Sequence, residues 1–245
     1  MPGELRVFPN AARVAQALAD LFIECAADAL AQRGRFFVSL AGGTTPKAAY
    51  ALLAQAPLRA AIDWSAVELF FGDERCVPPS DDESNYKMVM ETFARAAGVP
   101  ESNVHRMRGE DDPASAAAAY RTELIRALGQ EPRLDLTMLG MGPDGHTASL
   151  FPGADPLIGN DDLVRAVYSQ AHSQWRITMT PRVLNAARTI VFAVDGAAKA
   201  EALAEVRYGP RNPTKYPSQI IAPVDGRLIW LTDAAAATPP KNETL

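Results

Sequence analysis

Short apolar runs alternate along this chain with segments of helical periodicity, and this alternation limits the possible folds more than any other feature. A run that is apolar at successive positions fits a strand buried on both faces, and such strands occur in parallel sheets covered by helices. We therefore predict an α/β protein with a doubly wound, mostly parallel, Rossmann-like sheet and helices on both faces. The predicted strands are FFVSLAGG, VELFFGDE, LDLTMLGMG, RAVYS, WRITMTP, RTIVFAVDG and RLIWLTD.

Capping residues mark the ends of the predicted helices. Asn10 is expected to cap a first helix that Gly34 ends. Further helices are expected at about 46–55, 85–97, 113–128 and 196–206. No long linker or change of composition divides the chain, so we predict one domain from Leu5 to Asp233, followed by a flexible tail over 234–245.

Charge and hydropathy exclude several classes of protein. The 245 residues carry a net charge of −5, which argues against a broad nucleic-acid surface but leaves room for a local basic pocket. The N-terminus lacks the pattern of a signal peptide, and no apolar window reaches the length of a membrane span. We expect a cytoplasmic protein that binds neither nucleic acid nor a membrane.

Three loops that follow predicted strands contain glycine and charged residues. They are AGGTTPKAAY, GDERCVPPSDDESNY and GMGPDGHTASLFPG. Ligands of open parallel sheets bind beyond the carboxyl ends of the strands, where loops lead into helices. We therefore expect a site built from these three loops.

The first loop has the residues of a phosphate site. Gly42 and Gly43 allow a sharp turn, and Thr44 follows at the start of a helix, where backbone amides attract anions. The loop lacks the Lys-Ser/Thr ending of a nucleotide P-loop and the third glycine of a dinucleotide fingerprint. The alternative is a simple tight turn in which Thr44 caps the helix.

The second loop begins with charged residues. Asp73 and Arg75 directly follow the apolar run VELFF, at the end of the strand that faces a ligand crevice. Considered alone, these charges are better explained as a solvated charge cluster or a local ion pair.

The third loop places a histidine beside a carboxylate. Asp144 can orient His146, and an imidazole so placed can act as a general base near neutral pH. His105 and His172 lack such a setting and are interpreted as surface or packing residues. The three histidines are far apart and show no ligand spacing, so we expect no metal site.

Two basic residues are further candidates. Arg176 lies in an apolar strand pattern and Lys199 at the start of a helix. A guanidinium and an ammonium together suit a phosphate, although each can instead extend along an apolar surface.

Taken together, four segments resemble a known family. LAGGTTPKAAY, FFGDERCVPPSDDESNYKM, LDLTMLGMGPDGHTASLFPG and RITMTPRVLNAAR occur with the residues and order typical of the 6-phosphogluconolactonase family, and they cover nearly the whole chain. The resemblance implies a fold of the sugar-phosphate isomerase and deaminase group. It also implies a monomer that hydrolyses 6-phospho-D-glucono-1,5-lactone without a metal or cofactor.

The resemblance also implies roles for the candidate residues. His146 would be the general base and Asp144 would support it. Asp73 and Arg75 would lie against the sugar ring and the reacting carbonyl. The residues implied for the 6-phosphate are Gly42, Gly43, Thr44, Arg176 and Lys199.

Two alternatives differ in their chemistry. Glucosamine-6-phosphate deaminases resemble the same loops but place a glutamate five residues beyond the histidine, where this chain has Phe151. A catalytically silent sugar-phosphate sensor often carries a DNA-binding segment, and the sequence shows no such segment. Both features favour the lactonase.

Overall fold

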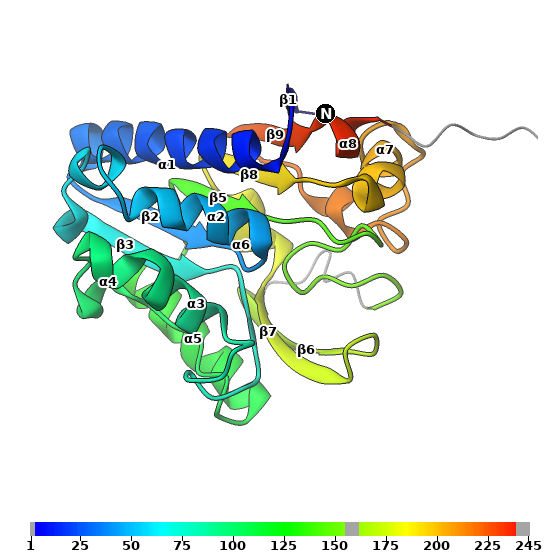
Figure 1. Ribbon diagram of the computed structural model, residues 1–245. Helices are drawn as coiled ribbons and strands as arrows, with labels where there is room; N and C mark the ends of the chain where they lie inside the picture. The colour runs from blue at the N-terminus through cyan, green and yellow to red at the C-terminus, as the bar shows by residue number, and fades with distance from the viewer. Residues whose placement is uncertain (1–2, 155–161, 239–245) are drawn as a thin grey trace, which may run out of the picture.

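A six-stranded sheet, in which each strand is parallel to its neighbours, forms the centre of the protein (Figure 1). The computed structural model describes residues 3–154 and 162–238. The strand order is β1-β9-β8-β5-β2-β3. The strands are β1 (Glu4–Phe8), β2 (Phe36–Leu40), β3 (Val67–Phe71), β5 (Leu136–Leu139), β8 (Thr189–Val194) and β9 (Arg227–Asp233).

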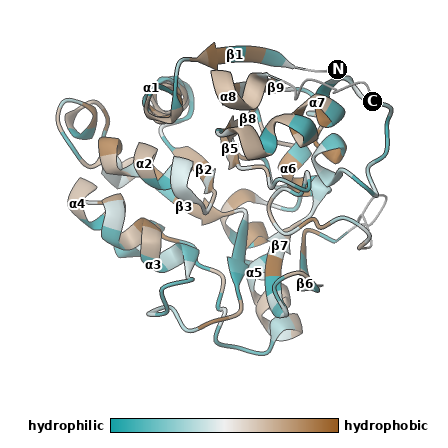
Figure 2. Ribbon diagram, turned by 45° about the vertical axis from the view of Figure 1, so that its right-hand side comes forward, coloured by the Kyte–Doolittle hydropathy of each residue, from teal (hydrophilic) through white to brown (hydrophobic). Residues whose placement is uncertain are grey.

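Helices pack on both sides of this sheet (Figure 2). The predicted α/β fold with a mostly parallel sheet is therefore confirmed. None of the helices in the described residues is long and apolar enough to cross a membrane. The helices are α1 (Ala11–Arg33), α2 (Thr44–Leu53), α3 (Asn85–Val89), α4 (Arg95–Ala97), α5 (Pro113–Leu128), α6 (Pro181–Asn185), α7 (Ala200–Tyr208) and α8 (Ala234–Ala237).

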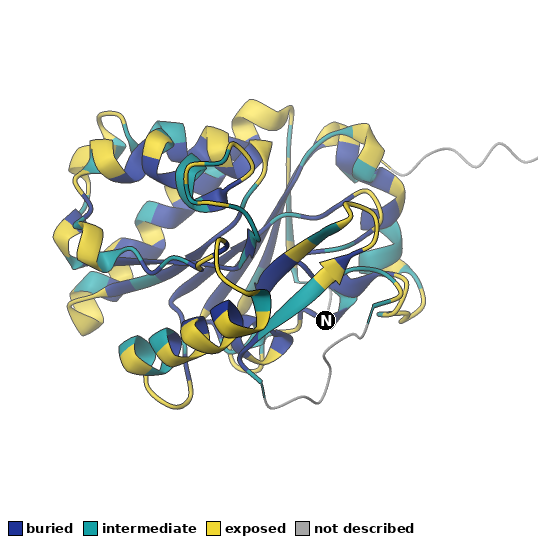
Figure 3. Ribbon diagram, turned by 90° about the horizontal axis from the view of Figure 1, so that it is seen from below, coloured by how far each residue is buried: buried dark blue, intermediate teal, exposed yellow. Residues whose placement is uncertain are grey.

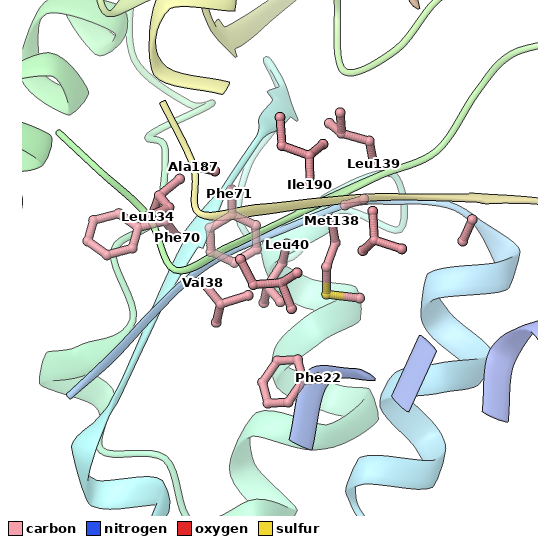
Figure 4. Close-up of a cluster of buried hydrophobic side chains, with 14 of the residues drawn as sticks. Phe22, Val38, Leu40, Phe70, Phe71, Leu134, Met138, Leu139, Ala187 and Ile190 are labelled. Atoms are coloured by element: carbon pink, nitrogen blue, oxygen red, sulfur yellow. The ribbon is translucent and has the colours of Figure 1, made fainter. Parts of the chain in front are cut away.

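The central strands are buried along their whole length, because helices cover both of their faces (Figure 3). Side chains from several strands and from α1 meet in the core shown in Figure 4, which includes Phe22, Val38 and Phe71. Apolar burial of this kind is the main favourable term in folding and makes the strand ends a firm support for loops.

A second, smaller sheet lies at one end of the first. Its order is β4 (Asp73–Arg75), β7 (Gln174–Met179) and β6 (Val164–Ser169), and both strand pairs are antiparallel. We predicted VELFFGDE as one strand, but Gly72 divides it into β3 and β4. The Gly72 amide donates a hydrogen bond to the carbonyl of Leu40 in β2, and its carbonyl accepts one from the amide of Met179 in β7. Gly72 thus joins the two sheets.

The helix predictions are mostly confirmed. Asn10 caps α1 by accepting from the amide of Arg13, and Gly34 ends the helix at φ 73°. α5 spans Pro113–Leu128 as predicted. α3, a π-helical turn and α4 together cover the predicted helix over 85–97.

The two ends of the chain differ from the prediction. β1 was not predicted, because its sequence ELRVF mixes charged and apolar residues and lacks the apolar run of the central strands, and its sheet partner β9 lies at the other end of the chain. The predicted tail begins too early, since 234–237 form α8 with Ala236 buried. Residues 239–245 of that tail lie outside the described residues.

The direction in which the chain adds strands to the sheet reverses at β2. From β2 the chain passes to β3 on one side and returns with β5 on the other side. The loops that follow β2 and β5 therefore leave adjacent strands in different directions. Such a switch point opens a crevice at the carboxyl ends of the strands.

Candidate active site

A cavity of about 300 Å³ opens at this switch point. Loops that follow β2, β3, β5 and β8 line it, together with part of β7. Eight of the nine residues predicted from the sequence line this one cavity: Gly42, Gly43, Thr44, Asp73, Arg75, His146, Arg176 and Lys199. The ninth, Asp144, lies behind His146.

The loop after β2 presents the N-terminus of α2 to the cavity. Gly43 is the N-cap at φ 103°, a conformation that favours glycine, and it makes no side-chain cap. Thr44 is the first helical residue, so the alternative in which Thr44 caps the helix is wrong. The first turn leaves backbone amides without intrahelical partners, and these suit an anion.

His146 is held against the loop that follows β5. Its Nδ1 lies 2.6 Å from Oδ1 of Asp144, and its backbone carbonyl accepts from the amide of Gly142 at 2.9 Å. A Cβ at Gly142 would overlap the imidazole and the Asp144 carboxylate, so only glycine allows this packing. The glycine-rich strand exit therefore fixes the histidine in one place.

The Asp144 carboxylate has a low pKa although it is partly buried. Burial raises the pKa, but the hydrogen bond to His146 and the charge of His146 outweigh burial and lower the pKa of Asp144 to about 2. Asp144 is thus ionised at neutral pH and can orient the ring so that Nε2 is the nitrogen left for chemistry.

Asp73 is held by a residue from the same loop as the histidine. Ser149 donates its hydroxyl hydrogen to Oδ2 of Asp73 at 2.7 Å, and its own amide donates to Oγ1 of Thr178. The serine thus connects the GDER strand to the His146 loop, and it fixes the Asp73 carboxylate at the cavity wall.

Three cations line the cavity. Arg75 and Arg176 are cross-strand partners in β4 and β7, and Arg176 is 7% exposed. Within the described ranges, the buried Nε atoms of both guanidinium groups have no hydrogen-bond partner. Lys199 donates to the carbonyl of Met141. Two adjacent guanidinium groups repel one another, so the site favours an anionic ligand.

Burial depresses the basicity of two of these cations. Burial lowers the pKa of Arg176, and the neighbouring charge of Arg75 lowers it further. Burial also lowers the pKa of Lys199, while the charges of Asp195 and Asp144 oppose the shift. A negatively charged ligand would offset both penalties.

Several residues at the cavity were not predicted. His172 was interpreted as a surface or packing residue, and it is exposed, but it also lines the cavity, and its Nδ1 lies 2.9 Å from Oγ of Ser169. Asn85 and Asp195 also line the cavity, and Asp195 accepts from the hydroxyl of Thr45. Asn85 follows the GDER loop and Asp195 follows the strand β8. Their positions in the sequence were therefore the signal by which both could have been predicted as site residues. The prediction for His105 is confirmed, since it is buried in the interior.

Across residues 3–154 and 162–238, no group of three or more His, Cys, Asp and Glu side chains is arranged to hold a metal ion. The chemistry available from the described side chains is anion binding by the three cations and the α2 N-terminus, with proton transfer by His146. The cavity thus combines cations that can bind a charged group with an imidazole at a fixed position.

Known proteins are similar to this chain in sequence and in fold. A family model described as glucosamine-6-phosphate isomerases/6-phosphogluconolactonase matches residues 9–230. A 6-phosphogluconolactonase of Nostoc sp. is 37% identical over 241 residues, which cover 96% of this chain and 98% of the relative. The 6-phosphogluconolactonase of Synechocystis sp. is 39% identical over 213 residues, which cover 85% of this chain and 86% of the relative. The solved structure of 6-phosphogluconolactonase from Trypanosoma cruzi aligns with a TM-score of 0.87 at 26% identity, covering 99% of this chain and 97% of that one.

Proposed function

Because the chain belongs to the glucosamine-6-phosphate isomerase/6-phosphogluconolactonase family, we propose that it hydrolyses 6-phospho-D-glucono-1,5-lactone to 6-phospho-D-gluconate. This reaction belongs to the oxidative pentose phosphate pathway. The observation that carries the proposal is the cavity that holds both an Asp144-bound imidazole and two adjacent arginines, the buried Arg176 and the half-buried Arg75.

The phosphate is the first group to be bound. Arg176 and Lys199 face the same cavity as the N-terminus of α2, so they can surround a phosphate dianion from two sides. A guanidinium supplies a planar fork of donors and a lysine supplies a compact charge. This anchor would hold the lactone ring near the remaining wall of the cavity.

The reaction then needs a water molecule and a base. His146 takes a proton from water through Nε2 as the water oxygen bonds to C1 of the lactone. The carbonyl oxygen gains negative charge, and Arg75 stabilises it. The bond from C1 to the ring oxygen breaks, and the proton held by His146 passes to that oxygen. The product is the open acid, which ionises.

The other residues set the geometry of this step. Asp144 keeps Nδ1 of His146 engaged, so Nε2 faces the water. Asp73, which Ser149 holds, is placed to accept a hydrogen bond from a sugar hydroxyl. Holding the substrate in this way raises the effective concentration of the attacking water at C1 of the lactone.

Phe151 separates this proposal from a deaminase. The Phe151 ring lies 5.2 Å from the His146 ring, between centroids, at the sequence position where the resemblance places a deaminase glutamate. A phenyl ring cannot carry a proton, so the ring opening of an amino sugar lacks its acid. We therefore favour the lactonase.

The experiment is a coupled assay. Glucose-6-phosphate is oxidised to the lactone, and acid release is followed with this protein, with its His146→Ala variant and without protein. The lactone also hydrolyses unaided, so only acceleration above the protein-free rate supports the proposal. Release of ammonia from glucosamine-6-phosphate, without acceleration of lactone hydrolysis, would support the deaminase instead.

We also propose that the protein acts as a cytoplasmic monomer with one catalytic domain. Within the described residues, one chain supplies the imidazole, the three cations and the α2 N-terminus that the proposed reaction uses. Light scattering during gel filtration tests the monomer, since a stable dimer would double the measured mass.

A further inference from the structure

The carboxyl group of Glu74 lies buried beside the cavity and accepts four hydrogen bonds. Its Oε1 accepts from the amides of Arg75 and Asn85, both at 2.8 Å. Its Oε2 accepts from the amide of Tyr86 at 2.8 Å and from the hydroxyl of Ser84 at 3.1 Å. The residue is 2% exposed, so this carboxylate is fully committed to protein contacts.

These four bonds join two elements of the site. Arg75 is the last residue of β4, whereas Ser84 is the N-cap of α3 and Asn85 its first residue. Glu74 therefore closes the loop over 76–83 and fixes the start of α3 against β4. Negative charge at a helix N-terminus is also favourable in its own right.

Both amides bonded by Oε1 belong to residues that line the cavity. Asn85 donates from Nδ2 to the carbonyl of Asp73 at 2.9 Å. A Cβ at Gly42 would overlap Oδ1 of Asn85, so the asparagine lies in contact with the loop after β2. The Arg75 guanidinium donates to the carbonyl of Glu83, inside the loop that Glu74 closes.

We propose that Glu74 is a positioning residue that holds Arg75 and Asn85 in place, and that Asn85 in turn sets the spacing between the Gly42 loop and Asp73. The proposal rests on the proposed function, because its effect is seen in lactone hydrolysis. A misplacement of about 1 Å can cost about 100-fold in rate, so small shifts of these two side chains matter.

The chemistry of the four donors explains why a carboxylate is needed. Three donors are backbone amides, which cannot accept a hydrogen bond, and they approach both oxygens. Glutamine has the same shape but one of its two terminal atoms is an NH₂ group. Glu74→Gln therefore places a donor against at least one amide without creating a cavity.

Glu68→Gln is a matched control. Glu68 is also a buried glutamate, 6% exposed, and its partners are Arg35 and His105, which do not line the cavity. We expect both variants to lose thermal stability. In folded protein, kcat/KM should fall by about tenfold or more in Glu74→Gln and change by less than about twofold in Glu68→Gln.

Asn85→Ala tests the same proposal without disturbing the buried carboxylate. It removes the side-chain amide but keeps the backbone bond to Glu74, and we expect kcat/KM to fall by about tenfold. A triple variant tests whether Glu74 acts through these two residues. If it does, adding Glu74→Gln to a variant that already carries Arg75→Ala and Asn85→Ala should change kcat/KM by less than about twofold.

Affinity for 6-phosphogluconate, measured by calorimetry in the same variants, adds a readout that needs no turnover. We expect weaker binding in Glu74→Gln and unchanged binding in Glu68→Gln. Wild-type kcat/KM and wild-type affinity in folded Glu74→Gln and Asn85→Ala would overturn the proposal. So would a triple variant in which Glu74→Gln lowers kcat/KM of the double variant as much as it lowers kcat/KM of the wild type. A wild-type protein that does not accelerate lactone hydrolysis would instead refute the proposed function.

Discussion

His105 and His146 each lie 2.6 Å from a carboxylate oxygen through Nδ1, but their second ring nitrogens differ. Nε2 of His105 lies 2.8 Å from Glu68, and the ring stacks on Phe70 with centroids 4.2 Å apart. Only 5% of its side chain is exposed. Both nitrogens are thus used by the interior, and His105 serves packing.

His146 keeps one nitrogen for a ligand. Its side chain is 26% exposed and faces the cavity, and its carboxylate partner Asp144 engages Nδ1 alone. A nearby carboxylate is therefore a poor sign of a catalytic histidine. The better sign is a second nitrogen that faces a cavity with charged walls.

The largest expected effect tests that distinction at His146. His146→Ala should lower kcat by about 10²- to 10⁴-fold, because it removes a positioned base. Affinity for 6-phosphogluconate should change little, since the phosphate contacts proposed for Arg176 and Lys199 remain. The measurements are kcat, inhibitor affinity and melting temperature on one preparation. Near-normal turnover by folded variant protein would contradict the role of His146.

His105→Ala should give the opposite result. It leaves the buried Glu68 and the part-exposed Glu123 without their shared partner, and we expect a loss of about 3 kcal/mol in the free energy of unfolding. Denaturant melts measure that loss, and kcat of the folded fraction should equal the wild-type value. A fall in kcat without a loss of stability would show that the interior histidine reaches the site.

The cationic wall of the cavity is the second feature that separates the two histidines. If Arg176 binds the phosphate as proposed, Arg176→Ala removes a charge-assisted contact worth about 1.5–3 kcal/mol, so KM should rise by roughly tenfold or more. Steady-state kinetics measure the change. Arg35, which pairs with Glu68 in the His105 region, offers a control, because Arg35→Ala should leave KM unchanged.

Local signals in the sequence account for what was predicted. Asn10 and Gly34 bound α1, and apolar runs reveal the strands of a parallel sheet. A parallel sheet brings the carboxyl ends of its strands to one edge, so the loop residues Gly42 and His146 share one cavity. The roles of these residues stay predictions.

Contacts between distant segments account for what was missed. His172 reaches the cavity because β6 and β7 pair with β4 in a separate antiparallel sheet, and no local pattern reveals that pairing. The four partners of Glu74 lie on both sides of a loop, so GDER alone cannot reveal them. Strand pairing and loop closure depend on the whole chain, whereas caps and periodicity depend on neighbours.

The smallest expected effect compares the two carboxylates in acid. The pKa of Asp144 is lowered to about 2, since the contacts with His146 outweigh burial. The pKa of Glu123 is also lowered to about 2, by the hydrogen bond from Arg126 first, with burial opposing and His105 adding to the shift. Each pKa lies below the unfolded value of about 4, so each carboxylate stabilises the fold above that pH, and the stability is lost as the pH falls toward 2.

Replacing either carboxylate should therefore flatten the loss of stability between about pH 4 and pH 2, by roughly 1 kcal/mol or less, because both side chains are partly exposed and solvent screens them. Thermal melts of Asp144→Asn and Glu123→Gln across this range measure the effect. At neutral pH the two variants should separate: Asp144→Asn should lower kcat, since the ring of His146 loses the partner that orients it, while Glu123→Gln should not. Equal kcat in both would mean that the carboxylate beside His146 is, like the one beside His105, a structural partner alone.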